Sequence, residues 1–327
     1  MKTIIICVFL LLPCAAGLHA QGDGIGLIPY RSGDRWGYAD KTKNIVIPAR
    51  FNQAWPFREG LAMVLTGGRY GYVNSAGEPV IKASYRDAGE FREGLAPVKI
   101  KGAWGYIDKD GHIVVPSKYE AALQPAEGEA AVRKNGRWGV LDTGTHKFIS
   151  TRYDEIFQFS QGLARVKTAG LYGYIDKTGG EAIPVVYEEA FPFQNGFAPA
   201  RLDGRWGFIS LADKVFKPEE YAGIGPYAEG LAHAEKKAGG SERCGYIDAE
   251  GVEKIPFNYF MCAAFSEGLA PVLKSPNGKW GFIDKTGKDA IAFKYDEVSG
   301  FKDGAAKAVV KGKAFYLDRA GAEYYRK

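Results

Sequence analysis

The sequence predicts an all-β protein: a tandem array of about nine antiparallel β-meander units, each close to 34 residues long. Two features of composition support this fold class, because 43 glycines and an aromatic content of 13% indicate many tight turns and strands. The third observation is internal repetition, since a Trp-Gly-Tyr-like string recurs at a constant interval. With 46% hydrophobic and 25% charged residues, the composition is that of a globular protein rather than a disordered one.

The recurring string sets the length of the unit. Its aromatic position falls at 36, 70, 104, 138, 172 and 206 in the chain, so five successive steps have the same length. Further copies follow at 244, 280 and 314, and the longer steps contain turn segments at 236–241 and 275–278, where insertions are tolerated. The units expected from this spacing are 25–59, 60–93, 94–127, 128–161, 162–195, 196–229, 230–267, 268–303 and 304–327.

The third unit illustrates how the strands are predicted. Residues 95–100 and 103–108 have strand-like patterns and are separated by the turn signal Lys101-Gly102. A second turn at 109–111 leads to a strand at 112–115, which ends before a proline because proline has no backbone donor for a ladder. Residues 119–123 are expected to form a fourth strand or an extended edge.

Each unit places an aromatic ring and a glycine side by side in its second strand. Alternation puts Trp104 and Tyr106 on one face and Gly105 on the other. Because one unit cannot bury both faces, we interpret the rings as the core between stacked units and the glycine as a point where a neighbouring unit approaches closely. The predicted repeat core consists of Trp36, Tyr70, Trp104, Trp138, Tyr172, Trp206, Trp280, Gly37, Gly71, Gly105, Gly139, Gly173, Gly207, Gly245 and Gly281.

The alternative interpretation of the ring column is a row of sugar-stacking platforms. Constant spacing favours the core over such platforms. Aromatic residues that break the spacing are better candidates for a surface site, and these are Trp55, Tyr227, Phe260, Tyr324 and Tyr325.

These strings resemble the WG-repeat family of bacterial proteins. The resemblance is clearest at residues 93–108, where Glu-Gly-Leu-Ala leads into Trp-Gly-Tyr-Ile-Asp, and at 113–120. It extends over essentially all of the chain from residue 21 onward, and it implies a repeat architecture without a shared catalytic motif. Cys244 and Ala314 replace the ring and Phe315 replaces the glycine in the copies that depart from the pattern.

The ends of the array favour an open, curved β-solenoid over the alternative, a closed β-propeller. The last unit stops at Lys327, before the aromatic that would complete it, and closure of a propeller usually borrows a strand from the other terminus. Residues 21–25, Gln-Gly-Asp-Gly-Ile, make a poor strand for this purpose. The polar segment 322–327 would suit a cap on an exposed edge.

Residues 1–20 are predicted to be a secretory signal peptide. Lys2 precedes an apolar run from Ile4 to Leu12, and small residues follow. The run is shorter than the roughly 20 residues that span a bilayer, and no later stretch approaches that length. We therefore expect an exported protein, periplasmic, cell-surface or secreted, without a transmembrane segment after processing. A lipoprotein acylated at Cys14 is the alternative, weakened by the proline before it.

The cysteines that remain after processing occupy related unit positions. Cys244 takes a ring position, and Cys262 takes a position that is alanine in several other units. If these positions touch, a disulfide can replace the contact between ring and alanine; two buried free thiols are the alternative.

No catalytic, cofactor-binding or metal site is predicted. Strings of the HExxH, CxxC, GxSxG and P-loop types are absent from the sequence, and His112, His146 and His233 fall at three different unit positions. An aspartate recurs after the second strand, and the string 108–111 slightly resembles a calcium loop, but the distal bidentate acid is missing. We expect these aspartates to accept hydrogen bonds from turn N–H groups.

The sequence therefore predicts an exported, non-catalytic binding or scaffold protein that presents a repetitive β surface to an envelope protein or a polysaccharide. A net charge of +5 is too small to indicate a nucleic-acid partner. The alternative function is an exported hydrolase whose site lies at the irregular junction of the sixth and seventh units, around residues 233–244. Polar departures from the repeat should gather in one cleft in an enzyme and spread along one surface in a scaffold.

Overall fold

The computed structural model describes residues 26–326 except 213, 215, 219, 239 and 240. The predicted signal peptide, residues 1–20, lies outside the described residues. Within them the named elements are short β-strands, paired mainly antiparallel, which confirms the all-β class.

The strands follow one another in groups of three or four. The first groups comprise β1 (Ile28–Ser32), β2 (Arg35–Ala39), β3 (Ile45–Phe51); β4 (Gln53–Arg58), β5 (Leu61–Thr66), β6 (Arg69–Val73), β7 (Pro79–Tyr85); β8 (Ala96–Ile100), β9 (Ala103–Ile107), β10 (Ile113–Tyr119). The middle groups comprise β11 (Ala121–Ala122), β12 (Glu129–Lys134), β13 (Arg137–Asp142), β14 (Phe148–Ser150); β15 (Glu155–Ser160), β16 (Leu163–Thr168), β17 (Leu171–Ile175), β18 (Glu181–Tyr187); β19 (Glu189–Ala190), β20 (Phe197–Leu202), β21 (Arg205–Ser210), β22 (Phe216–Pro218). The last groups comprise β23 (Gly223–Ala228), β24 (Leu231–Ala238), β25 (Ser241–Ile247), β26 (Glu253–Tyr259); β27 (Met261–Cys262), β28 (Leu269–Leu273), β29 (Trp280–Asp284), β30 (Asp289–Tyr295); β31 (Glu297–Val298), β32 (Ala305–Val310), β33 (Lys313–Asp318), β34 (Glu323–Arg326).

Turn chemistry explains why each group is a meander. Between β8 and β9, Lys101 and Gly102 both have positive φ, 50° and 92°, which is the geometry of a two-residue hairpin turn. The hairpin sets Lys99 opposite Trp104, and Trp104 lies opposite Tyr119 on β10. A second turn, between β4 and β5, falls at the expected unit boundary 59/60, so each sheet takes its first strand from the preceding sequence unit.

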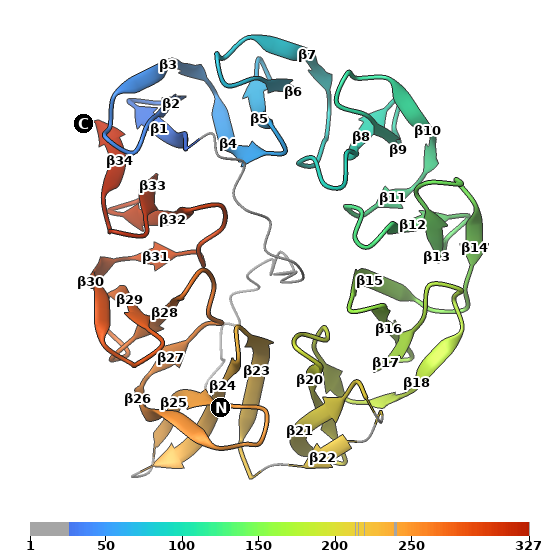
Figure 1. Ribbon diagram of the computed structural model, residues 1–327, viewed down its shortest axis with the longest axis vertical. Coiled ribbons are helices and arrows are strands. Elements are labelled where there is room, and N and C mark those ends of the chain that lie inside the picture. Colours follow the sequence, from blue (N-terminus) through green and yellow to red (C-terminus); the bar gives the residue numbers. More distant parts are fainter. Residues whose placement is uncertain (1–25, 213, 215, 219, 239–240, 327) are drawn as a thin grey trace, which may run out of the picture.

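The groups stand side by side in a ring (Figure 1). The first and last groups share one seven-stranded sheet, because β1 pairs in parallel with β34 at Arg31–Tyr325 and Ser32–Arg326. Across the same junction the rings of Trp36 and Tyr316 meet edge to face, with centroids 5.7 Å apart. The sequence favours an open array because residues 21–25 make a poor closing strand. These residues lie outside the described residues, and the pairing in the structure is instead that of β1 with β34 at the other end of the chain.

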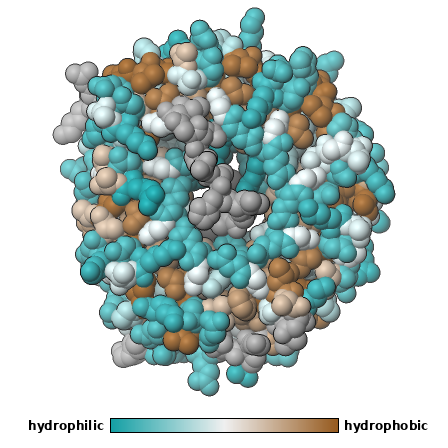
Figure 2. Space-filling view, viewed as in Figure 1, coloured by the Kyte–Doolittle hydropathy of each residue, from teal (hydrophilic) through white to brown (hydrophobic). Residues whose placement is uncertain are grey.

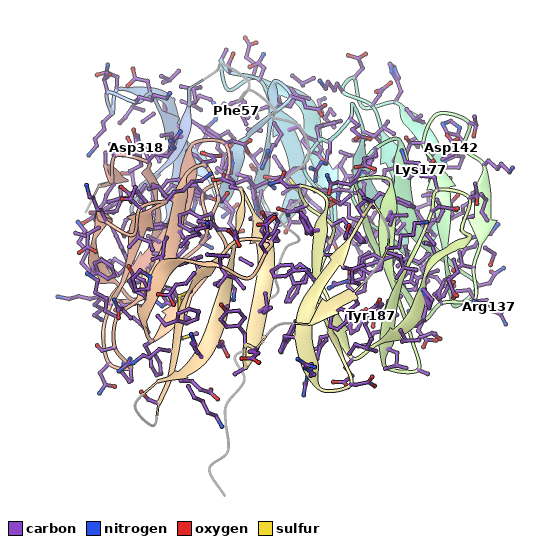
Figure 3. All side chains as sticks on the ribbon, turned by 60° about the horizontal axis from the view of Figure 1, so that its bottom comes forward. Phe57, Arg137, Asp142, Lys177, Tyr187 and Asp318 are labelled. Atoms are coloured by element: carbon purple, nitrogen blue, oxygen red, sulfur yellow. A yellow bond between two sulfur atoms is a disulfide. The ribbon has the colours of Figure 1, made fainter. Side chains whose placement is uncertain are left out.

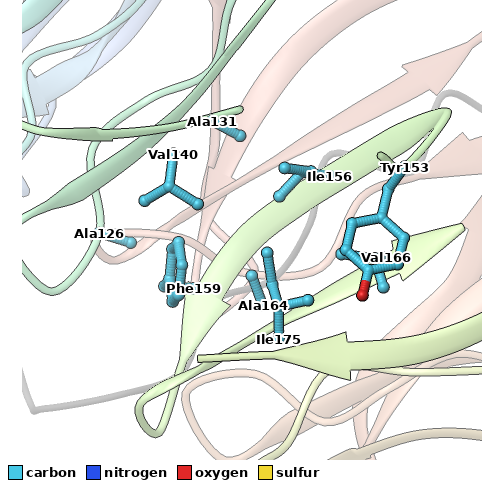
Figure 4. Packing of buried hydrophobic residues seen from close by; sticks show 9 residues of the cluster. All are labelled: Ala126, Ala131, Val140, Tyr153, Ile156, Phe159, Ala164, Val166 and Ile175. Atoms are coloured by element: carbon cyan, nitrogen blue, oxygen red, sulfur yellow. The ribbon is translucent and has the colours of Figure 1, made fainter. Parts of the chain in front are cut away.

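The hydrophobic core lies between neighbouring sheets. Figure 4 shows one such layer, in which Val140 of β13 faces Ile156 and Phe159 of β15. The deepest column is not the Trp position but the aromatic two residues later: Tyr106 is 0% exposed, whereas Trp104 is half-buried and packs against the cluster around it. The Tyr106 hydroxyl donates a hydrogen bond of 2.6 Å to the carbonyl oxygen of Leu123, which follows β11 and so links the sheet of Tyr106 to the β11–β14 sheet.

Turns on one side of the ring are tied to one another by carboxylates. Glu127, which has a positive φ of 58°, accepts hydrogen bonds from the backbone N–H groups of Gln161 and Gly162 in the equivalent turn one repeat later, at 2.6 and 2.7 Å. The Glu93 carboxylate makes the same contact with the backbone of Glu127 and Gly128. The acidic residue of such a Glu-Gly string therefore joins successive units, a role that the sequence did not predict.

The two sides of the ring carry different turns. Figure 3 labels Asp142 near the upper edge and Arg137 near the lower edge, at the two ends of β13. On the face seen in Figure 2, hydrophilic side chains cover most of the surface and hydrophobic ones lie in small separate groups.

Candidate functional site

The ring column packs between sheets against a small or branched residue of the following sheet. Trp36 packs on the cluster that contains Ala54, and Trp138 on the cluster that contains Ile156. Trp206 is the most deeply placed of the tryptophans, with 7% of its surface exposed, and belongs to the cluster of Ile224. Among the described residues, these contacts leave no continuous row of open indole faces.

The glycine column has a different neighbour from the one expected. A Cβ built on Gly105 would lie 2.5 Å from the carbonyl oxygen of Val115 and 2.8 Å from the backbone nitrogen of Ser117. Both atoms belong to β10, the outer strand of the same sheet, and not to a neighbouring sheet. The glycine is required because the outer strand crosses over it within the sheet.

The cysteine pair bridges two sheets. Cys244 on β25 and Cys262 on β27 are joined by a disulfide, with their Cα atoms 6.1 Å apart. The disulfide replaces the contact between an aromatic ring and an alanine that other pairs of sheets make at the same positions, such as Trp36 with Ala54.

The recurring aspartates shape turns. Asp108 Oδ1 accepts hydrogen bonds from the backbone N–H groups of Asp110 and His112, at 3.0 and 2.8 Å. In the corresponding turn at Asp142, a hydrogen bond from the Thr145 N–H lowers the pKa of the carboxyl group. Asp108, Asp110 and His112 offer ligand atoms within 4.8 Å of one another, but the turn hydrogen bonds already account for this arrangement.

A pocket opens between the β19–β22 and β23–β26 sheets, at the irregular junction of the sixth and seventh units. Its volume is about 300 Å³. The lining residues are Glu189, Phe191, Arg201, Trp206, Ala222, Gly223, Ile224, Gly225, His233 and Glu235. Most of the lining residues that differ from the residue at the same position in the preceding unit come from the β23–β26 sheet.

Missing side chains help to form the pocket. Phe191 stacks on Trp206 with centroids 6.1 Å and planes 23° apart, but the residue at the position of Phe191 in the following unit is Gly225. A Cβ on Gly225 would lie 1.9 Å from Cε1 of His233, so the imidazole packs directly over the glycine backbone. In the preceding sheet the residue equivalent to His233 is Pro199.

Burial determines the charge of His233. Loss of solvent lowers the pKa of the imidazole from 6.5 to about 4, so the ring is neutral at neutral pH. Its Nδ1 atom is buried and has no hydrogen-bond partner among the described residues. His233 belongs to the segment 233–244, at which the sequence places the site of the alternative hydrolase.

The charged residues of the pocket are unequally paired. Arg201 lies 3.1 Å from the Glu188 carboxylate and 3.6 Å from that of Glu189. Burial, and then the negative charge of Glu242, raise the pKa of Glu235. Sequence reasoning missed Glu235, Gly223 and Gly225, although aligning the units on their repeat shows each as a departure.

Comparisons with known structures give the fold. The crystal structure of a eukaryotic initiation factor is 13% identical, with 91% of this chain and 94% of that chain covered and a TM-score of 0.55. The structure of dihydro-heme d1 dehydrogenase NirN is also 13% identical, and the match covers 95% of this chain and 74% of that chain with a TM-score of 0.49. The structure of Kluyveromyces lactis Hsv2p is 9% identical, and the match covers 73% of this chain and 95% of that chain with a TM-score of 0.43. The likeness to the initiation factor shows an all-β, propeller-like fold alone.

A comparison with curated protein sequences finds no match. Among the described residues, no helix has both the length and the apolar character needed to cross a membrane.

The repeat itself is recognised along most of the chain. The family described as WG containing repeat matches seven segments: 36–70, 70–102, 104–138, 138–172, 172–206, 245–280 and 280–313. The unmatched stretch between 206 and 245 contains the deviant strands β23 and β24 of the pocket. The chain therefore belongs to the WG containing repeat family.

Proposed function

We propose that this chain is an exported, non-catalytic binding protein that holds one sugar unit of an envelope polysaccharide in the pocket between the β19–β22 and β23–β26 sheets. The sequence ranks an envelope protein above a polysaccharide as the partner, whereas the pocket favours the polysaccharide. The observation that carries the proposal is a cavity lined by departures from the repeat in which the His233 imidazole has no partner to orient it, since its Nδ1 makes no hydrogen bond among the described residues. The gathering of polar departures in one cleft also fits the hydrolase alternative, but a catalytic imidazole needs an orienting partner.

The size and the lining of the cavity support a sugar. A volume of about 300 Å³ lies at the lower end of small-molecule sites, which span roughly 300–1,000 Å³. Phe191 offers an apolar wall, and Arg201, Glu189 and Glu235 offer hydrogen-bonding groups around it. A mixture of ring and charged polar groups suits a ligand with apolar C–H faces and many hydroxyls.

We also propose that the array is a closed propeller rather than an open solenoid. Three contacts support closure: the β1–β34 pairing, the hydrogen bond of 3.0 Å from Arg31 Nη1 to the Ala314 carbonyl, and the ion pair of Arg58 with Asp303 at 2.5 Å. A closed array would hold the two pocket walls at a constant separation and so favour a preformed site.

Glycan-array binding by the purified chain after residue 20 tests the proposal. The hits are then titrated against the double variant Gly225→Phe/His233→Pro, which copies the Phe191 and Pro199 of the preceding sheet and fills the pocket. Binding to an envelope polysaccharide that the double variant loses, and that Glu253→Gln on the exposed part of β26 keeps, is the expected result. Absence of any glycan hit, or equal binding by the filled variant, would overturn the proposal.

The second candidate is the exported hydrolase at the same junction. The observation that favours it is that His233 and Glu235 line one pocket. A hydrolase screen on the purified chain distinguishes the two, because turnover that His233→Ala abolishes would replace the binding function by a catalytic one.

A further inference from the structure

One position in the pocket wall carries a charge opposite to that of the equivalent position in five other units, and in three more units this position is apolar, namely Leu65, Leu273 and Val309. The residue that stands opposite the ring position on the neighbouring strand is basic in five units, namely Arg31, Lys99, Arg133, Lys167 and Arg201. In the β23–β26 sheet the equivalent residue is Glu235, which lies opposite Cys244. This position therefore changes from a cation to an anion in the sheet that forms one wall of the pocket.

The partners of that position change with it. In the β19–β22 sheet Arg201 pairs with Glu188 and Glu189, and in the β11–β14 sheet Arg133 pairs with Glu120. The residues that correspond to Glu188 and Glu189 in the pocket sheet are Ala222 and Gly223. The whole ion-pair arrangement has been replaced, so Glu235 is not a single substitution within an unchanged environment.

Gly223 leaves the place that the Glu235 side chain occupies. A Cβ on Gly223 would lie 2.9 Å from Glu235 Oε2, closer than such contacts are observed. The carboxylate therefore lies against the bare backbone of β23, in the lining of the pocket.

The Glu235 carboxylate has no cationic partner within the part of the chain that the structure describes. Glu242 on β25 adds a second negative charge nearby. The adjacent Lys236 is directed elsewhere, with Nζ 5.9 Å from the Tyr221 ring centroid and 5.4 Å from that of Phe257. On the opposite wall, Arg201 is already shared by two carboxylates. Glu189 and Glu235 thus face the pocket together with a single guanidinium that is already paired, and an added cation would balance their negative charge.

We propose that the sugar held in this pocket carries a free, protonated amine, and that Glu235 binds the ammonium group. This inference rests on the proposed function and narrows it to polysaccharides that contain amino sugars without N-acetylation. Glu189 faces the same cavity from the other wall and supplies a further acceptor. N-acetylation of the amine removes its charge, so the same site would discriminate against the acetylated sugar.

The test compares hexamers of glucosamine and of N-acetylglucosamine by titration calorimetry, at a pH at which the amine is protonated and carboxylates are ionised. We expect the wild-type chain to bind the glucosamine hexamer at least about tenfold more tightly than its acetylated counterpart, the effect of one charge-assisted hydrogen bond. Glu235→Gln should remove this preference by weakening the binding of the amine form alone, and Glu253→Gln should leave it intact.

A second variant guards against a merely structural effect. Gly223→Glu/Glu235→Arg copies the Glu189–Arg201 ion pair of the preceding sheet, so it is compatible with the sheet, and it should exclude the glucosamine hexamer while the melting temperature stays near that of the wild type. Equal affinity of the wild type for both hexamers would overturn the amine preference and leave the proposed function standing. Absence of binding to both hexamers and to every other glycan would overturn the proposed function itself.

Discussion

Single residues in this fold are constrained by what lies over their Cα atoms. The Gly105 backbone is covered by Val115 and Ser117 at less than 3 Å from a Cβ position, whereas a Cβ on Gly144 would meet its nearest neighbour, Asp142 Oδ1, at 3.5 Å. The two glycines are therefore a matched pair, one enclosed and one open.

Gly105→Val is expected to lower the free energy of unfolding by about 3 kcal/mol, because the outer strand must move away and overpacking costs roughly 1–3 kcal/mol even before hydrogen bonds are lost. Chemical denaturation measures the change, with Gly144→Val as the control. Unfolding curves that coincide for the two variants would show that the covered position is not what constrains Gly105.

His233 links the pocket to pH. Its pKa is lowered to about 4 in the folded chain against 6.5 for an ordinary imidazole, so between these values the unfolded chain binds a proton that the folded chain does not. The contribution of His233 to stability is therefore present above pH 6.5 and is lost as the pH falls toward 4, by up to about 3 kcal/mol. His233→Asn should flatten the dependence of the unfolding free energy on pH in this window, and an unchanged slope would contradict the burial of the imidazole.

Neighbouring sheets are joined by a ring that packs against a small or branched residue, and the disulfide is a substitution within that type of contact. Trp36 and Ala54 illustrate the ordinary version between two sheets. Cys244 and Cys262 occupy the same positions between β25 and β27. The disulfide is therefore replaceable by the residues that other units use.

Reduction of the wild-type chain should cost about 3 kcal/mol, the value for closing a loop of comparable length. The variant Cys244→Trp/Cys262→Ala restores ring and alanine, so it should fold and melt at the same temperature with and without dithiothreitol. Thermal melts of both chains with and without the reductant check this. A variant that fails to fold, or a wild type indifferent to reduction, would contradict the equivalence of the two contacts.

The whole molecule depends on how its ends meet. Arg58 and Asp303, distant in the sequence, form an ion pair with side chains that are only 18% and 15% exposed. Lys302 reaches Glu90 at 2.9 Å beside it. Both pairs join the N-terminal third of the chain to residues 302–303, so an open array would break them.

A double-mutant cycle with Arg58→Ala and Asp303→Ala should give a coupling energy of about 1–3 kcal/mol in chemical denaturation, the range for charged neighbours with little solvent between them. The control is Arg152 with Glu181, an ion pair that is 72% and 36% exposed, for which coupling should stay below about 1 kcal/mol. Strict additivity at Arg58 and Asp303 would show that the ends separate in solution.

The sequence predicts the local parts of this structure better than the long-range ones. The all-β class, the turns and the aspartate hydrogen bonds follow from spacing, because they depend on residues a few positions apart. The depth of Tyr106 relative to Trp104 does not, since both lie on the same strand face and only the packing of the next sheet decides which is covered. The irregular spacing also predicts the junction at which the pocket lies. It does not single out Glu235, because this residue is unusual only when compared with the basic residues at the same position in other units.

The disulfide lies on only one side of the pocket-forming sheet. It fastens β25 to β27, whereas the cavity opens on the opposite flank, toward β19–β22. Within the described part of the chain, no covalent cross-link spans the two walls of the cavity, so its width is set by van der Waals and hydrogen-bonding contacts. Oxidation of the thiols would therefore anchor the wall that carries Glu235 to the C-terminal third of the chain, while the spacing of the other wall would depend on the non-covalent closure of the ring alone.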